Sequence, residues 1–401
     1  SSVPGMGYLL WPLALLPLFF RSTRRFALLL WASLLLWTAL VSLNGQVRWQ
    51  NARYSMPALA WVLLSAALGV GATFARLKEA KLRWAAYAGS LSVVLALGGF
   101  LFGQSERFRE QVWFFGRASR NILEQHIRSG YYLGAQSPRL TRILLSDAGA
   151  LPYDSGLPAF DLIGLGGYAS LPIAKASRQG VGAAVELIEH LPESTRPDVI
   201  ATYPSWWGEF ILYFGRPIRD FGVRGNVICG GASMVIYAPD WSPLQGSSTP
   251  FSLRPSERLI DTLDVADLLS EEAHHFSLAP QPAGYVSMKI LDNPADTTRG
   301  LWDAGRLLSP GHQLNFELSD FRGAPADLIL RIAPAEATEL VLHFKDQERI
   351  VAVEAQDNWQ EIRIPLGTQL GSQPFSLEVR KAGVVLHHIF AVAPTSQGAA
   401  P

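Results

Sequence analysis

Four apolar runs open the chain, at about 6–20, 26–43, 57–75 and 84–103, and none of them contains a charged residue. The last three approach the ~20 residues that a helix needs to cross a bilayer, whereas the first is short. A signal peptide would supply a single apolar run before a small-residue cleavage site. Helices buried in a soluble core are the alternative interpretation, but four uncharged runs in series favour a membrane. We therefore expect four transmembrane helices.

A different pattern follows in 104–139, where cations are interleaved with large apolar side chains. This mixture predicts an amphipathic helix in the membrane surface and then a connector, because arginine side chains can reach the headgroups from either side of a bilayer. The side chains that carry the pattern are Arg107, Phe108, Arg109, Val112, Trp113, Phe114, Phe115, Arg117 and Arg120.

Between 140 and 240, short apolar strands alternate with segments of helical spacing. Val181, Val185 and Ile188 recur on one face of a helix predicted over 179–190. Alternating strands and helices favour a mostly parallel sheet, so we expect a small α/β domain. The other predicted elements are strands at 142–146, 159–163, 198–202 and 232–238 and a short helix at 206–213.

A polar, proline-containing linker at 241–258 precedes a segment of different character, 259–393. Short alternating runs there are separated by Gly, Pro and Asp, which is typical of an antiparallel β-sandwich, and we expect a jelly-roll-like one. The tail, 394–401, has the composition of a disordered end. The strands expected in the sandwich are 287–290, 313–318, 327–332, 339–344, 349–353, 359–364, 375–379 and 384–391.

Charge divides the chain unevenly. Its 401 residues hold 34 Lys and Arg against 34 Asp and Glu, and a net charge of zero excludes a nucleic-acid binder driven by bulk charge. Residues 1–103 contain nine of the cations and one acid, which leaves 25 basic and 33 acidic residues for 104–401. The positive-inside rule places the two most basic loops, 21–25 and 76–83, in the cytoplasm. Everything after about 104 is then expected outside the membrane.

The sequence lacks several motifs that carry chemistry. It has no P-loop, no dinucleotide fingerprint after a strand, no His-Glu-x-x-His and no nucleophile elbow. The lone Cys229 cannot form an internal disulfide and fits no zinc pattern. Two histidine pairs, 274–275 and 387–388, invite a metal site, yet neighbours on a strand face opposite sides of a sheet. We therefore predict ordinary strand positions and no metal.

The most distinctive stretch, 146–167, gathers polar side chains at strand ends and turns, namely Asp147, Tyr153, Asp154 and Asp161. Carboxylates at strand ends can hydrogen-bond sugar hydroxyls. They can also simply terminate strands together with the neighbouring glycines. Both interpretations stay open.

Tryptophan side chains are a second candidate for sugar binding, because a flat apolar ring suits the C–H face of a pyranose. Trp206, Trp207 and Trp302 are the stacking candidates, and packing in a core or an interface is the alternative for each. Trp359 begins a predicted strand, which favours a place in the sandwich core.

Three short segments carry a family resemblance: 147–153 (Asp-Ala-Gly-Ala-Leu-Pro-Tyr), 155–158 (Ser-Gly-Leu-Pro) and 161–165 (Asp-Leu-Ile-Gly-Leu). Together they resemble the segment that begins the extracytoplasmic domain of bacterial GT-C glycosyltransferases of the arabinofuranosyl- and mannosyltransferase-like group. The loop 48–57 is similar to that family's external Arg-Tyr-x-x-Pro loop. The resemblance covers roughly 44–240.

This resemblance implies an inverting transfer of a sugar from a polyprenyl-phosphate donor to a glycan or protein acceptor outside the bacterial cytoplasmic membrane. Arg48 and Arg53 would hold the donor phosphate, and Tyr54 would pack beside its lipid chain. The four polar residues of 146–167 named above would form the acceptor side. The lipid-linked donor is the one small-molecule partner implied, and no other cofactor is expected.

The sequence departs from the family at the catalytic base. An Asp in the first external loop is expected to deprotonate the acceptor, but 1–20 and 44–56 contain no Asp or Glu. Because the chain also begins without Met, we expect it to be the C-terminal portion of a longer enzyme whose base lies upstream. The alternative is a non-catalytic, membrane-anchored module that binds glycan or assembles with another membrane complex.

Overall fold

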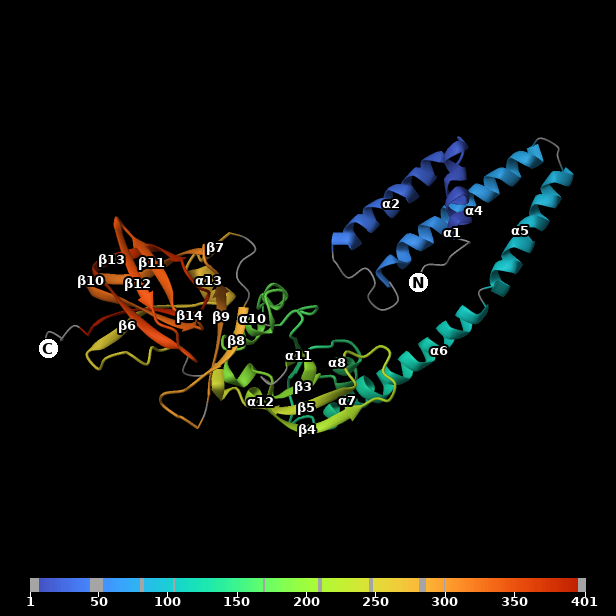
Figure 1. Cartoon of the computed structure of the whole chain (residues 1–401). Helices are drawn as coiled ribbons and strands as arrows, with labels where there is room; N and C mark the ends of the chain where they lie inside the picture. Colours follow the sequence, from blue (N-terminus) through green and yellow to red (C-terminus); the bar gives the residue numbers. More distant parts are fainter. Residues whose placement is uncertain are drawn as a thin grey trace. The chain divides into compact units, whose positions relative to one another are not determined.

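The structure, a computed structural model, divides the chain into two compact units, Ser1–Ala118 and Ser119–Pro401 (Figure 1). The described residues are 7–43, 53–79, 83–103, 105–168, 170–207, 211–244, 248–280, 286–298 and 300–395.

The first unit is helical, and its helices are joined by side-chain hydrogen bonds and by a close contact at a glycine. Ser65 Oγ and Trp31 Nε1 both donate to the carbonyl oxygen of Ala14, at 2.7 and 3.1 Å. A Cβ atom on Gly69 would lie 2.6 Å from a backbone oxygen of the first helix, so glycine permits this close approach. The elements are α1 (Gly7–Leu15), η1 (Leu16–Phe19), α2 (Arg24–Leu43), η2 (Arg53–Ser55), α4 (Met56–Glu79) and α5 (Arg83–Gly103).

Two of these helices, α2 and α4, are long enough and apolar enough to cross a membrane, with mean hydropathies of 2.1 and 1.9. They are 17% and 22% buried, whereas the core helix of a soluble protein is mostly buried. Their length and composition support two of the four predicted spans. The apolar helix at Leu10–Phe19 is shorter, and a membrane position for it and for α5 stays a prediction.

A helix forms where the amphipathic segment was predicted. α6 (Ser105–Ile122) exposes 70% of Phe108, 63% of Trp113 and 74% of Phe115. It continues through a π-helical turn, Leu123–Ile127, into α7 (Arg128–Gly134). Contact between α6 and a membrane surface stays a prediction.

The second unit begins with a five-stranded sheet of order β2-β1-β3-β5-β4. β1 pairs in parallel with β2 and β3, but β5 pairs antiparallel with β3 and β4. The predicted mostly parallel sheet is therefore wrong for this half, because the short connection from β4 to β5 forces an antiparallel hairpin. The strands are β1 (Ile143–Leu145), β2 (Ala159–Asp161), β3 (Val199–Thr202), β4 (Gly215–Gly222) and β5 (Ser233–Pro239).

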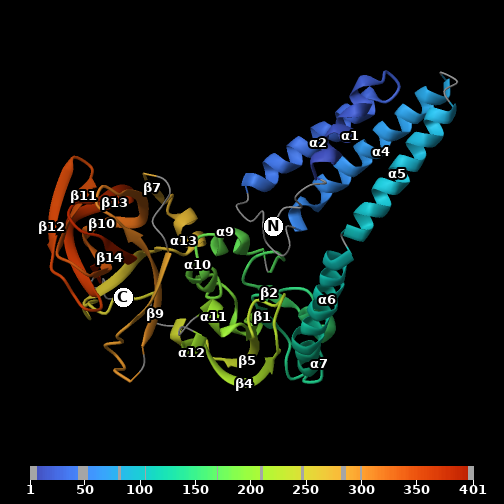
Figure 2. The same ribbon diagram turned by 45° about the vertical axis from the view of Figure 1, so that its right-hand side comes forward.

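Short helices connect these strands and cover the sheet. One of them, α10, lies between the five-stranded sheet and strands β8 and β9 of the second sheet (Figure 2). The helices are α8 (Ala150–Ser155), α9 (Ile173–Ser177), α10 (Val181–Glu186), η4 (Glu193–Thr195), α11 (Pro204–Trp207), α12 (Ile211–Phe214) and η6 (Ser242–Leu244).

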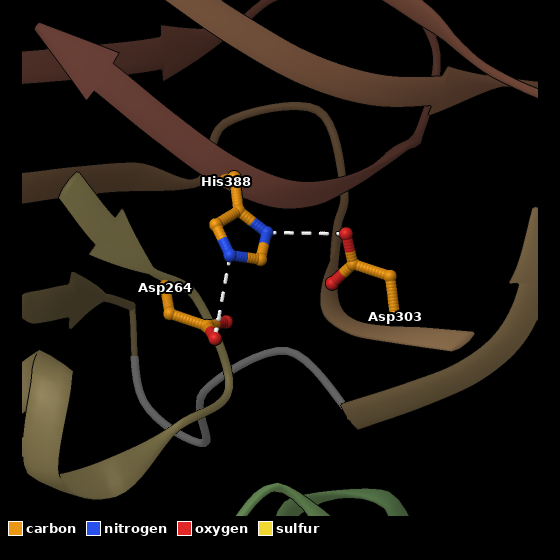
Figure 3. A group of neighbouring side chains, drawn as sticks. All are labelled: Asp264, Asp303 and His388. Atoms are coloured by element: carbon orange, nitrogen blue, oxygen red, sulfur yellow. Dashed lines mark hydrogen bonds and ion pairs between the residues drawn. The ribbon is translucent and has the colours of Figure 1, made fainter. Parts of the chain in front are cut away.

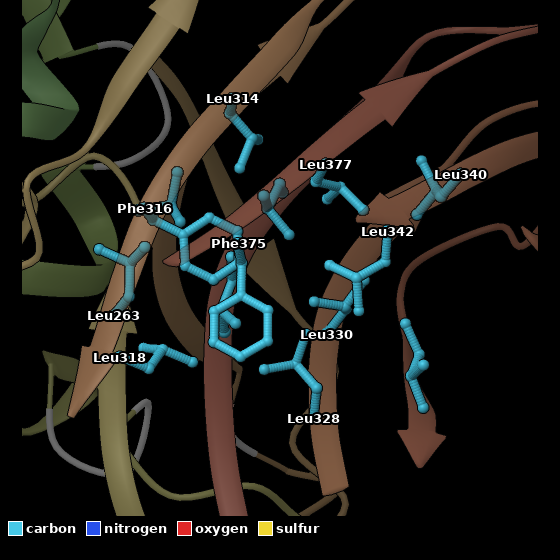
Figure 4. Packing of buried hydrophobic residues seen from close by; sticks show 14 of the residues in the cluster. Leu263, Leu314, Phe316, Leu318, Leu328, Leu330, Leu340, Leu342, Phe375 and Leu377 are labelled. Carbon is cyan, nitrogen blue, oxygen red and sulfur yellow. The ribbon is translucent and has the colours of Figure 1, made fainter. Parts of the chain in front are cut away.

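The second sheet is an antiparallel β-sandwich, as predicted. Its path is β12-β11-β13-β10-β14-β9-β8, with β6 paired to β14 and β7 to β10. Figure 4 shows the aliphatic and aromatic side chains that fill the space between its layers. The elements are β6 (Glu257–Asp264), α13 (Leu268–Ala273), β7 (Ser277–Ala279), β8 (Val286–Leu291), β9 (Leu301–Leu308), β10 (Gln313–Pro334), β11 (Thr338–Phe344), β12 (Gln347–Val353), β13 (Gln360–Val379) and β14 (Val384–Pro394).

Two strands of the sandwich are longer than the sequence pattern predicted. The predicted strands 313–318 and 327–332 are the two halves of β10, and 359–364 and 375–379 lie in β13. Register shifts between Leu318 and Asp327 let this long pair bend without breaking its ladder. β14 extends into the predicted tail as far as Pro394, and residues 396–401 of that tail lie outside the described residues.

The two sheets share one hydrophobic cluster. Trp302 and Ala304 of β9 are fully buried together with Phe160 of β2 and Ala184 of α10. The α/β part and the sandwich therefore form one folding unit rather than two independent domains joined by a linker.

Candidate functional site

The structure describes part of the predicted donor site. Arg48 lies outside the described residues, whereas Arg53 and Tyr54 belong to η2. The carbonyl oxygen of Tyr54 accepts a hydrogen bond of 2.6 Å from Trp37 Nε1, which ties this turn to α2. An apolar groove of about 370 Å³ adjoins the turn at Ser55. Phosphate binding by the two arginines and lipid packing by Tyr54 stay predictions.

Asp147 belongs to a polar network that follows β1. Its Oδ2 accepts from the Tyr203 hydroxyl at 2.9 Å and lies 3.6 Å from His126 Nε2. Burial lowers the pKa of His126 although Asp147 acts against it, and burial together with Asp147 raises the pKa of Tyr203. The Asp147 side chain keeps 32% of its surface exposed, so it can still contact a ligand.

The other predicted acceptor residues differ in exposure. Tyr153 is 87% exposed, and Asp154 lies in α8. Asp161 is 3% exposed and accepts backbone N–H groups of Ile163, Leu165 and Gly166, at 2.8–3.1 Å. Its carboxylate closes the turn after β2, so an acceptor contact by Asp161 is wrong and the strand-terminating interpretation is confirmed for it.

Two of the three predicted stacking tryptophans are core residues. Trp207 and Trp302 are 2% and 1% exposed and pack in the cluster that joins the two sheets. Neither ring presents a face to a sugar, so the prediction is wrong for both. Trp206 is 37% exposed and packs on Tyr203 with ring centroids 5.1 Å apart, and stacking on it stays a prediction.

An open cleft of about 860 Å³ lies at the edge of the sandwich, where the segment after β8 faces the start of β13. Trp359 and Phe251 form its aromatic side, with ring centroids 5.5 Å apart. Trp359 is half-buried, and its Nε1 donates to the Asp292 carbonyl at 2.9 Å. The core position predicted for Trp359 is therefore wrong, because the strand begins at the rim of the sheet and leaves the ring on the cleft.

Polar side chains line the rest of the cleft. Asp292 and Asp357 are exposed, and Asn293 and Asn358 are half-buried beside them. The loop after β8 is held by its own hydrogen bonds, since Asn293 Oδ1 accepts the N–H of Ala295 at 2.9 Å. The cleft thus combines an aromatic wall with carboxylate and amide groups on a loop of defined shape.

A buried arginine fixes the aromatic wall from behind. The guanidinium of Arg331 lies 5.3 Å from the ring centroid of Trp359 and 5.4 Å from that of Phe251. It donates to Glu361 Oε1 at 3.0 Å, and Glu361 in turn accepts the backbone N–H of Phe251 at 3.1 Å. Both aromatic side chains are therefore held by cation–π contacts and by a charged hydrogen-bond network.

Arg331 also reaches a buried group of carboxylates and histidine, which we call the acidic cluster: Glu186, Glu189, Asp264, Asp303 and His388. Arg331 Nη1 and His388 Nδ1 both lie 3.1 Å from Asp303 Oδ2. His388 Nε2 lies 3.3 Å from Asp264 Oδ2, so the imidazole stands between two carboxylates (Figure 3).

The cluster perturbs the protonation of its members. Burial lowers the pKa of His388, but Asp264 and Asp303 outweigh it and raise that pKa to about 10. Burial raises the pKa of Asp303, but His388 and Arg331 bring it down to about 2. Burial raises the pKa of Asp264 to about 6, and burial with neighbouring carboxylates raises the pKa values of Glu186 and Glu189. His388 is thus an imidazolium at neutral pH.

Sequence reasoning missed both the cleft and the acidic cluster. A weak signal for the cleft existed in the two polar turns around Asp292 and Asp357, each beside a strand. His387 and His388 are 0% and 1% exposed, and Nδ1 of each approaches the carboxylate of Asp303, at 3.8 and 3.1 Å. The predicted opposite faces are therefore wrong here, because a register shift interrupts the alternation of β14 at His387. The carboxylates near His388 come from three other segments of the chain, so no local pattern could reveal them.

Comparison with known proteins gives one family match. A family model described as a domain of unknown function (DUF8728) matches residues 120–255. The matched segment contains the whole five-stranded sheet, and the description leaves its function open. No curated protein matches the chain.

Several solved structures are similar to part of the chain. A carbohydrate-binding module of lichenase 5A from Cellvibrio mixtus, in complex with cellotriose, is 16% identical over 34% of this chain and 99% of its own, with a TM-score of 0.25. The C-terminal module of the laminarinase LamC from Zobellia galactanivorans is 14% identical over 29% and 98%, with a TM-score of 0.21. A family 35 module from an environmental isolate is 16% identical over 30% and 99%, with a TM-score of 0.22. Likenesses this weak carry no argument about what the chain binds.

Proposed function

We propose that this chain is a membrane-anchored module that binds a neutral glycan in the cleft of Trp359. One observation carries the proposal: an aromatic wall faces carboxylate and amide groups across an open cleft of about 860 Å³. A sugar ring needs both kinds of surface, because its C–H face packs on an aromatic ring and its hydroxyls need hydrogen-bond partners. The helices α2 and α4 would anchor the module.

The charge of the cleft favours a neutral ligand. Asp292 and Asp357 are exposed there, and Glu361 lies at the base of the aromatic wall. A uronic acid or a phosphate would meet these carboxylates without a compensating exposed cation among the described lining residues. Hydroxyl groups, in contrast, donate readily to carboxylates.

The test is binding of neutral oligosaccharides to the purified full chain by isothermal titration calorimetry. The probes are cello-, xylo-, manno- and arabino-oligosaccharides, each at millimolar concentration. We expect one of these series to bind and Trp359→Ala to weaken that binding more than about tenfold, as for an anchor aromatic residue. Asp357→Asn, in an exposed turn, should also weaken binding without disturbing the fold.

Trp113→Ala is the matched control, since Trp113 is an exposed tryptophan of α6 outside the cleft. It should leave the affinity unchanged. Absence of binding to all four series would refute the proposal. Wild-type affinity in both the Trp359→Ala and the Asp357→Asn variant would refute it as well. The transferase activity implied by the family resemblance stays a prediction, as does its polyprenyl-phosphate donor.

A further inference from the structure

The acidic cluster carries an inference that is independent of glycan binding. Ligand-type atoms of Glu186, Glu189 and Asp264 lie within 4.8 Å of one another, and so do those of Asp264, Asp303 and His388. Asp264 belongs to both groups. The five side chains thus form one continuous set of oxygen and nitrogen atoms around a common carboxylate.

Three carboxylate oxygens of this set have no hydrogen-bond partner in the described part of the chain, namely Glu189 Oε1, Asp264 Oδ1 and Asp303 Oδ1. Asp303 and His388 are each 1% exposed, so water does not satisfy them from outside. Figure 3 shows the second oxygen of Asp303 on the side of Asp264. Buried polar atoms in proteins are nearly always paired, so three unpaired oxygens in one cluster indicate a ligand.

The orientation of His388 indicates what kind of ligand. Its Nδ1 lies 3.1 Å from Asp303 Oδ2, and its Nε2 lies 3.3 Å from Asp264 Oδ2. A metal-binding histidine typically donates one ring N–H to a carboxylate and so directs the other nitrogen at the metal. Here Asp303 would be the carboxylate that accepts the N–H of His388.

We propose that the acidic cluster binds one divalent cation of the Mn²⁺ or Zn²⁺ class. His388 Nε2, Asp264, Glu186 and Glu189 are the ligands, and Asp303 is a positioning residue that fixes the imidazole. The cation replaces the proton on Nε2. An imidazole among carboxylates suits these ions better than Ca²⁺ or Mg²⁺, which prefer oxygen ligands alone.

The site has an entrance, and each group of three needs little adjustment. Two ligands bonded to one ion at about 2.1 Å each lie no more than about 4.2 Å apart, and the ligand atoms within each group lie within 4.8 Å. An ion bound at Asp264, which belongs to both groups, draws His388 and the two glutamates closer to one another. Asp264 and Glu189 are partly exposed, the Asp264 side chain by 14%, and give an ion access from solvent.

The experiment is equilibrium dialysis of the purified full chain against MnCl₂ or ZnSO₄, with bound metal counted by mass spectrometry. We expect one ion per chain. Glu189→Gln, at the partly exposed edge of the cluster, and His388→Gln should each weaken binding more than about tenfold. Glu272→Gln removes an exposed carboxylate from nearby α13 and should change nothing. Electron spin-echo spectra of bound Mn²⁺ should show one directly bonded nitrogen.

Absence of binding of either metal would overturn the proposal. Binding that persists in Glu189→Gln would do so as well, and this variant decides the matter even if His388→Gln fails to fold. A bound Mn²⁺ without a nitrogen ligand would equally refute it. Because no variant touches the aromatic wall, oligosaccharide binding by the same samples reports separately on the glycan proposal.

Discussion

Arg331 is the residue on which two features of the molecule depend. Its side chain is 0% exposed and pairs with Asp303 at 3.1 Å and Glu361 at 3.0 Å. The first contact holds the acidic cluster, and the second holds the aromatic wall of the cleft. Two carboxylates with 1% and 5% exposure therefore share one buried positive charge.

We predict that Arg331→Met lowers the free energy of unfolding by about 3–5 kcal/mol, because it leaves two buried carboxylates without their cation. Chemical denaturation of the full chain measures this loss. Arg380→Met is the control, since Arg380 is 36% exposed and pairs with Glu339 at 3.8 Å, and it should cost no more than about 1 kcal/mol. Equal losses in the two variants would contradict the importance assigned to the buried pairs.

His274 gives a pH dependence whose sign follows from its partner. Its Nε2 lies 3.2 Å from Asp261 Oδ1. Burial lowers the pKa of His274, but the hydrogen bonds to Asp261 and to the Ser270 carbonyl outweigh it, so the pKa is raised above 6.5. The stability that this ion pair contributes is complete below pH 6.5 and is lost as pH rises through the folded value.

We therefore predict that His274→Gln destabilises the chain most near about pH 6 and least near about pH 9. Urea denaturation of wild type and variant at both pH values gives the difference. His275→Gln serves as the reference for loss of a neighbouring exposed imidazole, because His275 is 76% exposed. A His274 effect that is constant or grows toward alkaline pH would show that the histidine does not act through its charge.

At the residue scale, the sequence predicted the role of a side chain where that role depends on neighbouring residues in the chain. The turn role of Asp161 follows from Asp and Gly after a short strand, and it was one of two interpretations left open. Burial of Trp302 and of His388 could not be predicted, because each depends on what covers its strand. That covering comes from α10 and β6, which lie far away in the sequence.

At the element scale, Gly164 fixes the join between β2 and α9. It has φ of 80°, and a Cβ atom there would lie 2.4 Å from the Cα of Ala174. Gly371, between the halves of β13, has φ of 69° but open space around its Cβ position. The two glycines share a backbone conformation and differ in their surroundings.

This pair gives a prediction. Gly371→Ala should cost about 1–2 kcal/mol from backbone strain alone, whereas Gly164→Ala should cost more because α9 must also move. Thermal unfolding of both variants measures the difference. If Gly371→Ala proved the more damaging, the close approach of α9 to the turn would be wrong.

Strand positions in the sandwich were the most predictable elements. Alternating apolar residues identified both halves of β10 and of β13, since one side of each strand faces the core. The pattern did not reveal that each pair of halves is continuous, because the bends at 319–326 and 366–374 interrupt the alternation. β6, β7 and β9 were missed: β9 is buried on both sides and does not alternate.

At the scale of the whole molecule, the two units should separate by solubility. We predict that the full chain stays in the pellet when membranes are washed with alkaline carbonate, because α2 and α4 are apolar and poorly buried. The segment 119–401 should stay in the supernatant. Immunoblots of both fractions make the comparison, and a full chain released by carbonate would argue against membrane-spanning helices.

The connection between the two sheets coincides with a change of sequence pattern at 241–258, but the packing of one sheet against the other could not be predicted. A polar linker at 241–258 suggested two independent domains. This segment does connect the two sheets, yet β9 and α10 bury their side chains in one cluster. A hydrophobic cluster shared by two sheets cannot be detected in the composition, because its residues have the same types as the core residues of a single domain.

The shared cluster has a consequence for how this chain can have evolved. Trp302 and Ala304 belong to the sandwich by chain order but complete the core of the α/β part, and Glu186 accepts the N–H of Ala304 at 2.8 Å. A sandwich transferred alone into another protein would expose Trp302 and Ala304. The remaining α/β part would keep the carboxylate of Glu186 without its backbone N–H partner. A cut at the 241–258 connection should therefore destabilise both parts, whereas changes in the exposed outer loops should leave the shared cluster intact.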